Sequence, residues 1–193
     1  MIYTKKIKEA VRFSIKTHEV YQKQKRKGKD IAYITHPLTV GIILARAGAH
    51  EDVIVAGILH DTIEDSTEEK KVTARMIEER FGKHVTKLVL SVTEQNRKRS
   101  WDEVKKEALE HIARFSNDSL LVKSADIISN TSELIDDYGK DGGKVFDRFF
   151  SSKEKYLEHQ LALIRAIKLE WAENPLIPNL TQNASYLKRM LVA

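Results

Sequence analysis

The chain has 193 residues, of which 41% are hydrophobic and 32% charged, and its formal net charge is +5. This composition excludes a disordered chain, and the length suits one domain with a sizeable core. There is no cysteine, which excludes disulfides and thiolate ligands, and no apolar run approaches the ~20 residues of a membrane span. We therefore expect a cytoplasmic protein with no membrane segment. Its positive charge favours an anionic partner, either nucleic acid or a phosphate-rich small molecule.

The first third of the chain is predicted to be helical. With only 3 prolines and 8 glycines, the sequence has few helix breakers. Apolar residues recur at helical spacing over residues 3–23, which predicts an amphipathic helix followed by a basic loop at 23–29. A second helix is predicted over residues 35–48, with Thr35 as its N-cap and Pro37 in its first turn.

The rest of the chain continues the helical pattern. Further helices are predicted at 51–60, 73–80, 85–92, 101–114, 117–136, 145–171 and, shorter, near 183–191. Ser100 and Glu103 have the spacing of a capping box. Residues 95–99 are interpreted as a polar, basic loop.

Glycine and proline residues predict where the later helices end. A turn is predicted over 139–143, and Pro175 and Pro178 are expected to end the long helix before them. No segment shows sustained strand alternation. The predicted fold is therefore all-α, a single helical bundle of roughly 8–10 helices.

One buried stretch carries an unusual charge pattern. Nearly all residues from Val53 to Leu59 are apolar or small, and the run ends in His60 and Asp61, with Glu64 and Asp65 shortly after. Ionised side chains are costly to bury unless something pairs with them. A divalent metal would provide that partner.

Other parts of the chain supply the remaining metal ligands. His36 stands at a predicted helix start, and Asp126 interrupts the apolar run 120–128. Two imidazoles and two carboxylates suit a hard or borderline divalent metal with open positions for water and phosphate. The alternative is a buried polar network without metal, and for Glu64 and Asp65 a solvated acidic turn.

The order of His36, His60-Asp61 and Asp126 resembles the HD-domain metal-dependent phosphohydrolases, which are all-helical. Four flanking motifs narrow the resemblance to the hydrolase domain of the Rel/Spo stringent-response enzymes: Tyr33-Ile34-Thr35-His36-Pro37-Leu38, His60-Asp61-Thr62-Ile63-Glu64-Asp65, Phe81-Gly82, and Leu88-Val89 leading to Val92-Thr93-Glu94. The resemblance covers residues 5–165 or so. It implies a single HD hydrolase domain over 1–193, with a C-terminal helical extension.

The resemblance also implies a reaction and roles for particular residues. The chain is similar to a stand-alone small alarmone hydrolase that uses Mn²⁺ or another divalent metal to remove the 3′-pyrophosphate from (p)ppGpp. The implied metal ligands are His36, His60, Asp61 and Asp126. Glu64 and Asp65 are the acidic pair that orients or activates the attacking water. The implied substrate contacts are Arg26, Lys27, Lys123 and Asn130.

The implied partner is a small guanine nucleotide rather than nucleic acid or a membrane, and the oligomeric state is left open. Histidines outside the ligand set, His18 among them, are interpreted as structural or surface residues. Trp101 and Trp171 are interpreted as helix-packing residues.

Some positions depart from the family pattern. Ala32 replaces a proline, Val104 replaces an arginine, 127–131 lacks a basic residue followed by leucine, and the aromatic cluster near 157–160 is reduced to Tyr156. These positions face substrate in the family. One alternative is therefore an HD phosphohydrolase that acts on a 5′-nucleotide, a related alarmone or an NADPH-type phosphate.

An alternative of a different class is a binding module. It would be either a degenerate hydrolase that sequesters a nucleotide or a basic helical protein that binds nucleic acid through 23–29 and 95–99. Binding to nucleic acid would weaken steeply with salt.

Overall fold

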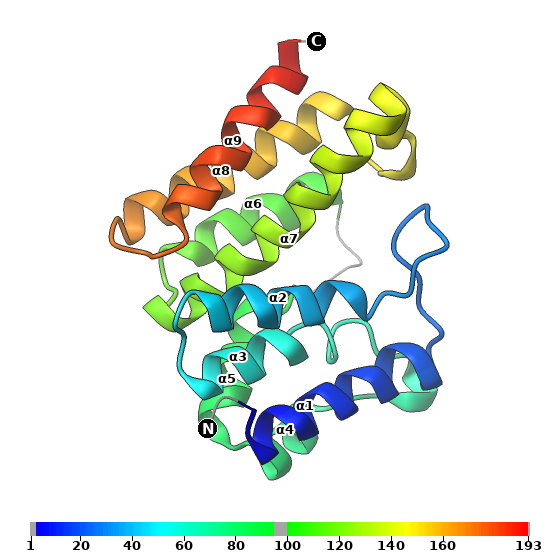
Figure 1. Cartoon of the computed structure of the whole chain (residues 1–193), viewed down its shortest axis with the longest axis vertical. Coiled ribbons are helices and arrows are strands. Elements are labelled where there is room, and N and C mark those ends of the chain that lie inside the picture. Colours follow the sequence, from blue (N-terminus) through cyan, green and yellow to red (C-terminus); the bar gives the residue numbers. More distant parts are fainter. Residues whose placement is uncertain (1–2, 95–99, 193) are drawn as a thin grey trace. The chain divides into compact units, whose positions relative to one another are not determined.

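The computed structural model describes residues 3–94 and 100–192, so the loop predicted at 95–99 lies outside the described residues. The described residues contain nine α-helices, and their only β pairing is an isolated bridge between Lys25 and Ala32. The predicted all-α fold is confirmed. The chain divides into two compact units, residues 1–95 and 96–193 (Figure 1). Within the described residues, no helix combines the length and apolarity needed to cross a bilayer.

The first unit is built around α3. Its elements are α1 (Lys5–Ile15), the π-helical turn η1 (Lys16–Tyr21), α2 (Thr35–Arg46), α3 (Glu51–Leu59), the short 3₁₀ turn η2 (Glu68–Lys70), α4 (Ala74–Phe81) and α5 (Lys83–Val92). Helices α1, α2 and α5 all pack against α3. Six residues of α3 are buried, which explains why this helix has no polar face.

Two glycines allow α2 and α3 to pack closely. A Cβ atom on Gly57 would lie 2.2 Å from Cδ1 of Leu44, and one on Gly41 would lie 2.6 Å from Cγ1 of Ile58. Any larger side chain at these positions would push the helices apart. The close packing fixes the start of α2 relative to the end of α3.

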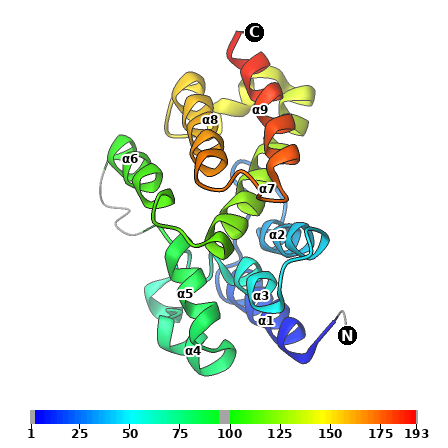
Figure 2. The ribbon, with the colours of Figure 1, turned by 90° about the vertical axis from the view of Figure 1, so that its left-hand side faces the viewer.

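The second unit consists of α6 (Trp101–Ile112), α7 (Asn117–Asp141), the 3₁₀ segment η3 (Gly142–Arg148), α8 (Lys153–Glu170) and α9 (Ile177–Val192). Helix α9 packs on both α7 and α8, and α6 packs on α8, as Figure 2 shows from the side. The capping box predicted for Ser100 and Glu103 is present. Two buried asparagines, Asn174 and Asn183, tie the chain around α9 to α7 by donating to Ser124 and Thr131 at 2.9 and 2.8 Å.

The predicted cap of α2 is wrong. Ile34 is the N-cap residue and has helical backbone angles, and its hydrocarbon side chain makes no cap hydrogen bond. Thr35 is the first helical residue, and its hydroxyl donates to the carbonyl of Ala32 at 2.8 Å. Pro37 does lie in the first turn, where a missing N–H breaks no helical bond.

Three boundaries in the second unit also differ from prediction. Helix α7 runs through Gly139 and stops at Gly142, whose positive φ of 62° ends it. The following helix starts after Ser152, whose side chain accepts from the N–H of Lys155, and not at residue 145. Pro178 does not end a helix but lies in the first turn of α9.

Candidate metal centre and acidic pair

Three of the predicted metal ligands meet in the first unit. His36 lies in the first turn of α2 and His60 directly after α3, and both are buried. Their Nε2 atoms are 3.3 Å apart. The carboxylate oxygens of Asp61 lie 3.1 Å from Nε2 of His60 and 3.6 Å from Nε2 of His36. Two imidazoles and a carboxylate therefore converge on one point.

Hydrogen bonding defines which nitrogen of His60 is available to a metal. Its Nδ1 lies 2.8 Å from the carbonyl oxygen of Gly57, which can only accept, so Nδ1 carries a proton. In the neutral ring, Nε2 then directs a lone pair toward Oδ1 of Asp61, another acceptor. Two acceptors facing each other are stabilised by a second ring proton or by a cation between them. The mixed N/O donor set fits a divalent metal.

Tyr33 is a partner of this centre to which sequence reasoning assigned no role. Its hydroxyl donates to Oδ2 of Asp61 at 2.5 Å. Burial, reinforced by the carboxylates of Asp61 and Asp65, raises the pKa of Tyr33 well above its ordinary value. Tyr33 therefore remains a hydrogen-bond donor and orients Asp61. Its place three residues before His36 was the only available signal.

The acidic pair is held by donors from distant segments. Oε2 of Glu64 accepts from the backbone N–H of Glu94 at 2.8 Å. Oδ2 of Asp65 accepts from Nε2 of Gln24 at 3.0 Å. Both acids are partly buried, whereas Glu68 nearby is 90% exposed. Their surroundings thus differ from those of a solvated acidic turn.

A buried histidine lies behind Asp65. Nδ1 of His18 is 2.8 Å from Oε1 of Gln24, whose amide nitrogen contacts Asp65. Because the amide oxygen only accepts, Nδ1 of His18 is the donor, and a chain of two hydrogen bonds reaches Asp65. His18 is fully buried in η1, and its Nε2 has no hydrogen-bond partner in the part of the chain that the structure describes. Nothing in the sequence pattern distinguishes His18 or Gln24 from packing residues.

The predicted basic pair lies on the loop between η1 and α2. The guanidinium of Arg26 lies 5.4 Å from the ring centroid of Tyr33, close enough for a cation–π contact. Lys27 is exposed in the adjacent turn. Arg26 therefore contacts Tyr33, the residue that orients Asp61.

In the second unit, Asp126 has an organised environment of its own. It is buried on α7, where Nζ of Lys123 donates to Oδ2 at 2.8 Å and Nδ2 of Asn130 donates to Oδ1 at 2.6 Å. Residues three and four apart share a helix face, which brings these side chains together. Two of the four residues predicted to contact substrate, Lys123 and Asn130, therefore orient the carboxylate of Asp126.

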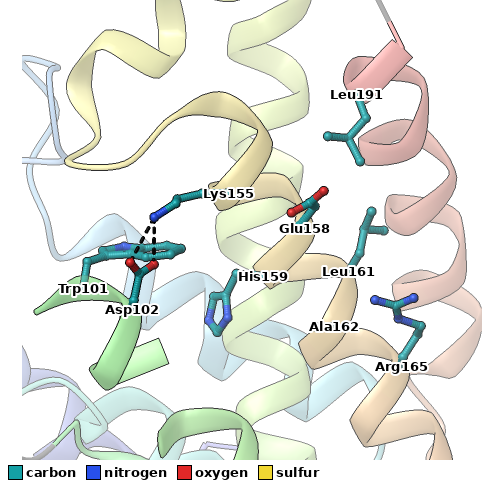
Figure 3. Close-up of a pocket in the computed structure, with 9 residues that line it drawn as sticks. All are labelled: Trp101, Asp102, Lys155, Glu158, His159, Leu161, Ala162, Arg165 and Leu191. Atoms are coloured by element: carbon teal, nitrogen blue, oxygen red, sulfur yellow. Dashed lines mark hydrogen bonds and ion pairs between the residues drawn. The ribbon is translucent and has the colours of Figure 1, made fainter. Parts of the chain in front are cut away.

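A pocket of about 580 Å³ in the second unit holds none of these residues (Figure 3). The edge-on pair Trp101 and His159 forms one wall, with ring centroids 5.8 Å apart. Lys155 donates to both carboxylate oxygens of Asp102, at 3.1 and 2.9 Å. Its remaining charged residues, Glu158 and Arg165, are of opposite sign. The balanced charge gives this pocket no preference for a phosphate ligand.

The helical fold and the His, His-Asp donor cluster define an HD-type protein. The HD-domain family model matches residues 10–139, and the chain belongs to this family. The matched segment contains His36, His60, Asp61 and Asp126.

Several similar curated proteins carry the name of a 3′-pyrophosphohydrolase, and others are named GTP pyrophosphokinase. The guanosine-3′,5′-bis(diphosphate) 3′-pyrophosphohydrolase MESH1 of Xenopus tropicalis is 34% identical over 130 residues, which cover 66% of this chain and 69% of that protein. The zebrafish (Danio rerio) MESH1 is 33% identical, and the match covers 65% of this chain and 67% of that protein. The 3′-pyrophosphohydrolase of Aquifex aeolicus is 41% identical over 91 residues, 47% of this chain, and the match spans 12% of its length.

Solved structures show the same fold. A metazoan orthologue of SpoT, described as hydrolysing ppGpp, superposes with a TM-score of 0.77 over 97% of both chains at 22% identity. The lmo0812 protein of Listeria monocytogenes EGD-e gives 0.71 at 28% identity, covering 82% of this chain and 99% of that one.

Proposed function

We propose that the protein is a metal-dependent hydrolase that removes the 3′-pyrophosphate from (p)ppGpp, giving GDP or GTP and pyrophosphate. The observation that carries this proposal is the end of α3, where His60 and Asp61 meet His36 and the acidic pair follows at once. The shared enzyme name of the MESH1 relatives supports the substrate.

The metal is held, in this proposal, by His36, His60, Asp61 and Asp126, with Mn²⁺ as the expected ion. The donor set, and the proton on Nδ1 of His60 that leaves Nε2 to bind a metal, support the first three ligands. The family match, which includes Asp126, supports the fourth and supports treating the two units as one hydrolase domain. A bound divalent metal lowers the pKa of water and polarises a phosphoryl oxygen.

The protein's own residues orient the reactants. Glu64 and Asp65 position the attacking water and accept its proton. A bond forms between the water oxygen and phosphorus, and the bond from phosphorus to the ribose 3′-oxygen breaks. The proton taken from the water is passed to the 3′-oxygen, which leaves as a hydroxyl, and the pyrophosphate departs with the oxygen of the water. Arg26 and Lys27 offset the substrate's negative charge. Lys123 and Asn130 donate hydrogen bonds to Asp126 and, in this proposal, also contact the nucleotide.

A second candidate is an HD phosphohydrolase that acts on another nucleotide. The observation that favours it is the departure from the family pattern at Ala32, Val104 and 127–131. These residues do not belong to the proposed metal set. The second candidate therefore changes the substrate but not the reaction class.

Turnover of a nucleotide panel separates the two candidates. Purified protein with Mn²⁺ is incubated with ppGpp, 5′-monophosphates and NADPH, and release of pyrophosphate or phosphate is followed. We expect pyrophosphate from ppGpp alone. Turnover of a different nucleotide with none of ppGpp would refute the substrate assignment.

Asp126→Ala tests the fourth ligand. We expect loss of metal binding and at least about 100-fold lower activity with unchanged helical content. Asp136→Ala, on an exposed position of the same helix, is the matched control and should retain both. Full activity in Asp126→Ala would rule out the proposed ligand set.

A further inference from the structure

Cations gather around two aromatic rings in a separate pocket of the first unit. The pocket has a volume of about 270 Å³ and lies between α1, η1, η2 and α4; α1 and α4 can be located in Figure 1. Its lining side chains are Phe13, Lys16, Thr17, Tyr21, Glu69, Lys70, Lys71, Val72, Met76 and Arg80. None of them belongs to the proposed metal, acidic or substrate sets. The pocket contains four cations and a single carboxylate.

Three of these cations have aromatic rather than acidic neighbours. Nζ of Lys16 and Nζ of Lys70 lie 5.3 and 5.4 Å from the ring centroid of Tyr21. The guanidinium of Arg80 lies 5.4 Å from the ring centroid of Phe13. Within residues 3–94, no carboxylate forms an ion pair with any of the three, whereas Lys71 pairs with Glu68 at 2.9 Å. Their charge remains available to a ligand.

These cations lower the pKa of the Tyr21 hydroxyl. A hydrogen bond with Lys16 is the largest influence that lowers the pKa of the Tyr21 hydroxyl. Burial opposes this lowering, and the charges of Lys16, Lys70 and Arg80 each add a smaller lowering effect, so that the pKa is lowered on balance. Three cations from three different elements therefore act on the Tyr21 hydroxyl.

The shape and chemistry of the pocket select a class of ligand. Two ammonium groups already lie near the ring of Tyr21, so a base that stacked on the ring would compete with them. The volume of about 270 Å³ is below the ~300–1,000 Å³ typical of sites for drug-sized ligands. A compact anion with several charges would interact with all three cations that lack an acidic partner in the first unit. We propose that this pocket binds a pyrophosphate group, either as the free anion or as the phosphate tail of a nucleotide.

Calorimetric titration of the full chain with inorganic pyrophosphate tests this site. The experiment is done in EDTA, so that no divalent metal contributes to binding and no turnover occurs. The Lys16→Gln, Lys70→Gln double variant removes two of these three cations. We expect it to weaken pyrophosphate binding on the order of 10- to 100-fold, since charge-assisted contacts to phosphate are the strong ones.

The Lys8→Gln, Lys87→Gln double variant is the matched control. It removes the same charge from two exposed positions of the first unit outside the pocket and should bind within about 2-fold of wild type. Circular dichroism checks that both variants fold. GTP that competes with pyrophosphate would support a nucleotide tail as the ligand, and GTP that does not compete would support the free anion. Absence of pyrophosphate binding, or an equal loss in both double variants, would overturn the proposal.

Discussion

Gln24 connects a buried histidine to a proposed catalytic acid. Its amide accepts from His18 through the oxygen and donates to Asp65 through the nitrogen. The bond from Gln24 therefore orients one oxygen of the Asp65 carboxylate, and it comes from an uncharged side chain. An acid that must place a water molecule benefits from such a neutral, directional partner.

Gln24→Leu removes this donor while keeping a side chain of similar size. We expect about a 10-fold lower kcat for ppGpp hydrolysis, because Asp65 loses its orientation, with the Mn²⁺ affinity nearly unchanged, because Asp65 is not a proposed ligand. Gln182→Leu, at an exposed position of α9, should leave both quantities unchanged. An unaltered kcat in Gln24→Leu would mean that Asp65 does not depend on this bond.

Tyr33 makes the folded protein sensitive to alkaline pH. Its pKa is raised in the folded state, while a tyrosine in the unfolded chain ionises near pH ~10. The stability linked to a raised pKa is fully present below the unfolded value and is lost as pH rises through the folded value. The free energy of unfolding should therefore fall above pH ~10. Urea denaturation at several pH values should show a steeper fall for wild type than for Tyr33→Phe.

The control for this experiment is Tyr186→Phe, because Tyr186 is 39% exposed on α9. It should follow the wild-type pH profile. Parallel profiles for wild type and Tyr33→Phe would show that Tyr33 has the same pKa in the folded protein and in the unfolded chain.

At the scale of elements, the contact between α2 and α3 holds the candidate metal centre together. Gly57→Ala would place a Cβ atom 2.2 Å from Cδ1 of Leu44, which is itself fully buried. Overpacking of this kind costs about 1–3 kcal/mol, and the free energy of unfolding should fall by that amount. Metal affinity should fall as well, because the carbonyl of Gly57 holds His60. Urea denaturation and a Mn²⁺ titration measure the two effects.

Gly139→Ala provides a matched comparison in α7. Nothing lies within 4 Å of a Cβ at this position. The substitution should therefore be neutral or stabilise by up to about 1 kcal/mol, since alanine is the better helix former. Equal effects of the two substitutions would contradict the packing explanation.

The helices themselves were predictable, but their ends were less so. Apolar spacing located all the main helices, and the Ser100–Glu103 capping box was read directly from the sequence. The cap at Thr35 was wrong because capping depends on the backbone of the preceding residue, which is already helical at Ile34. The sequence predicts a turn from Gly139, but the helix continues to Gly142, where a positive φ ends it.

Some residues of the site are likewise identifiable from the sequence, whereas others are identified only by the fold. His60, Asp61, Glu64 and Asp65 stand together in the chain, so their unusual charge was visible in the sequence. Gln24 was not identified, because it lies 41 residues from Asp65 and only the tertiary fold brings them together. Tyr33 belonged to a recognised motif, but its role required the bond to Asp61.

At the scale of the whole molecule, metal binding should contribute to stability. A ligand that binds only the folded state at 100 times its Kd stabilises by about 2.7 kcal/mol. We expect saturating Mn²⁺ to raise Tm by roughly 5 °C or more relative to EDTA. Asp61→Asn should abolish most of the increase, because it removes the carboxylate that faces both imidazoles.

Thermal unfolding followed by circular dichroism gives this measurement, and Asp136→Asn serves as a control for the loss of one carboxylate. A Tm that does not respond to Mn²⁺ or other divalent ions in wild type would contradict a metal centre at His36, His60 and Asp61.

The π-helical turn of residues 16–21 determines what the deletion of a single residue from this segment would do. In this turn the N–H of Gln22 bonds to the carbonyl of Thr17, five residues earlier, at 3.2 Å. A π turn contains one residue more than an α turn, so deleting one residue would allow a regular α-helix to form. The deletion would rotate His18 by about 100° relative to Gln24, because an α-helix has 3.6 residues per turn. Over evolutionary time, this segment should therefore accept substitutions more readily than deletions.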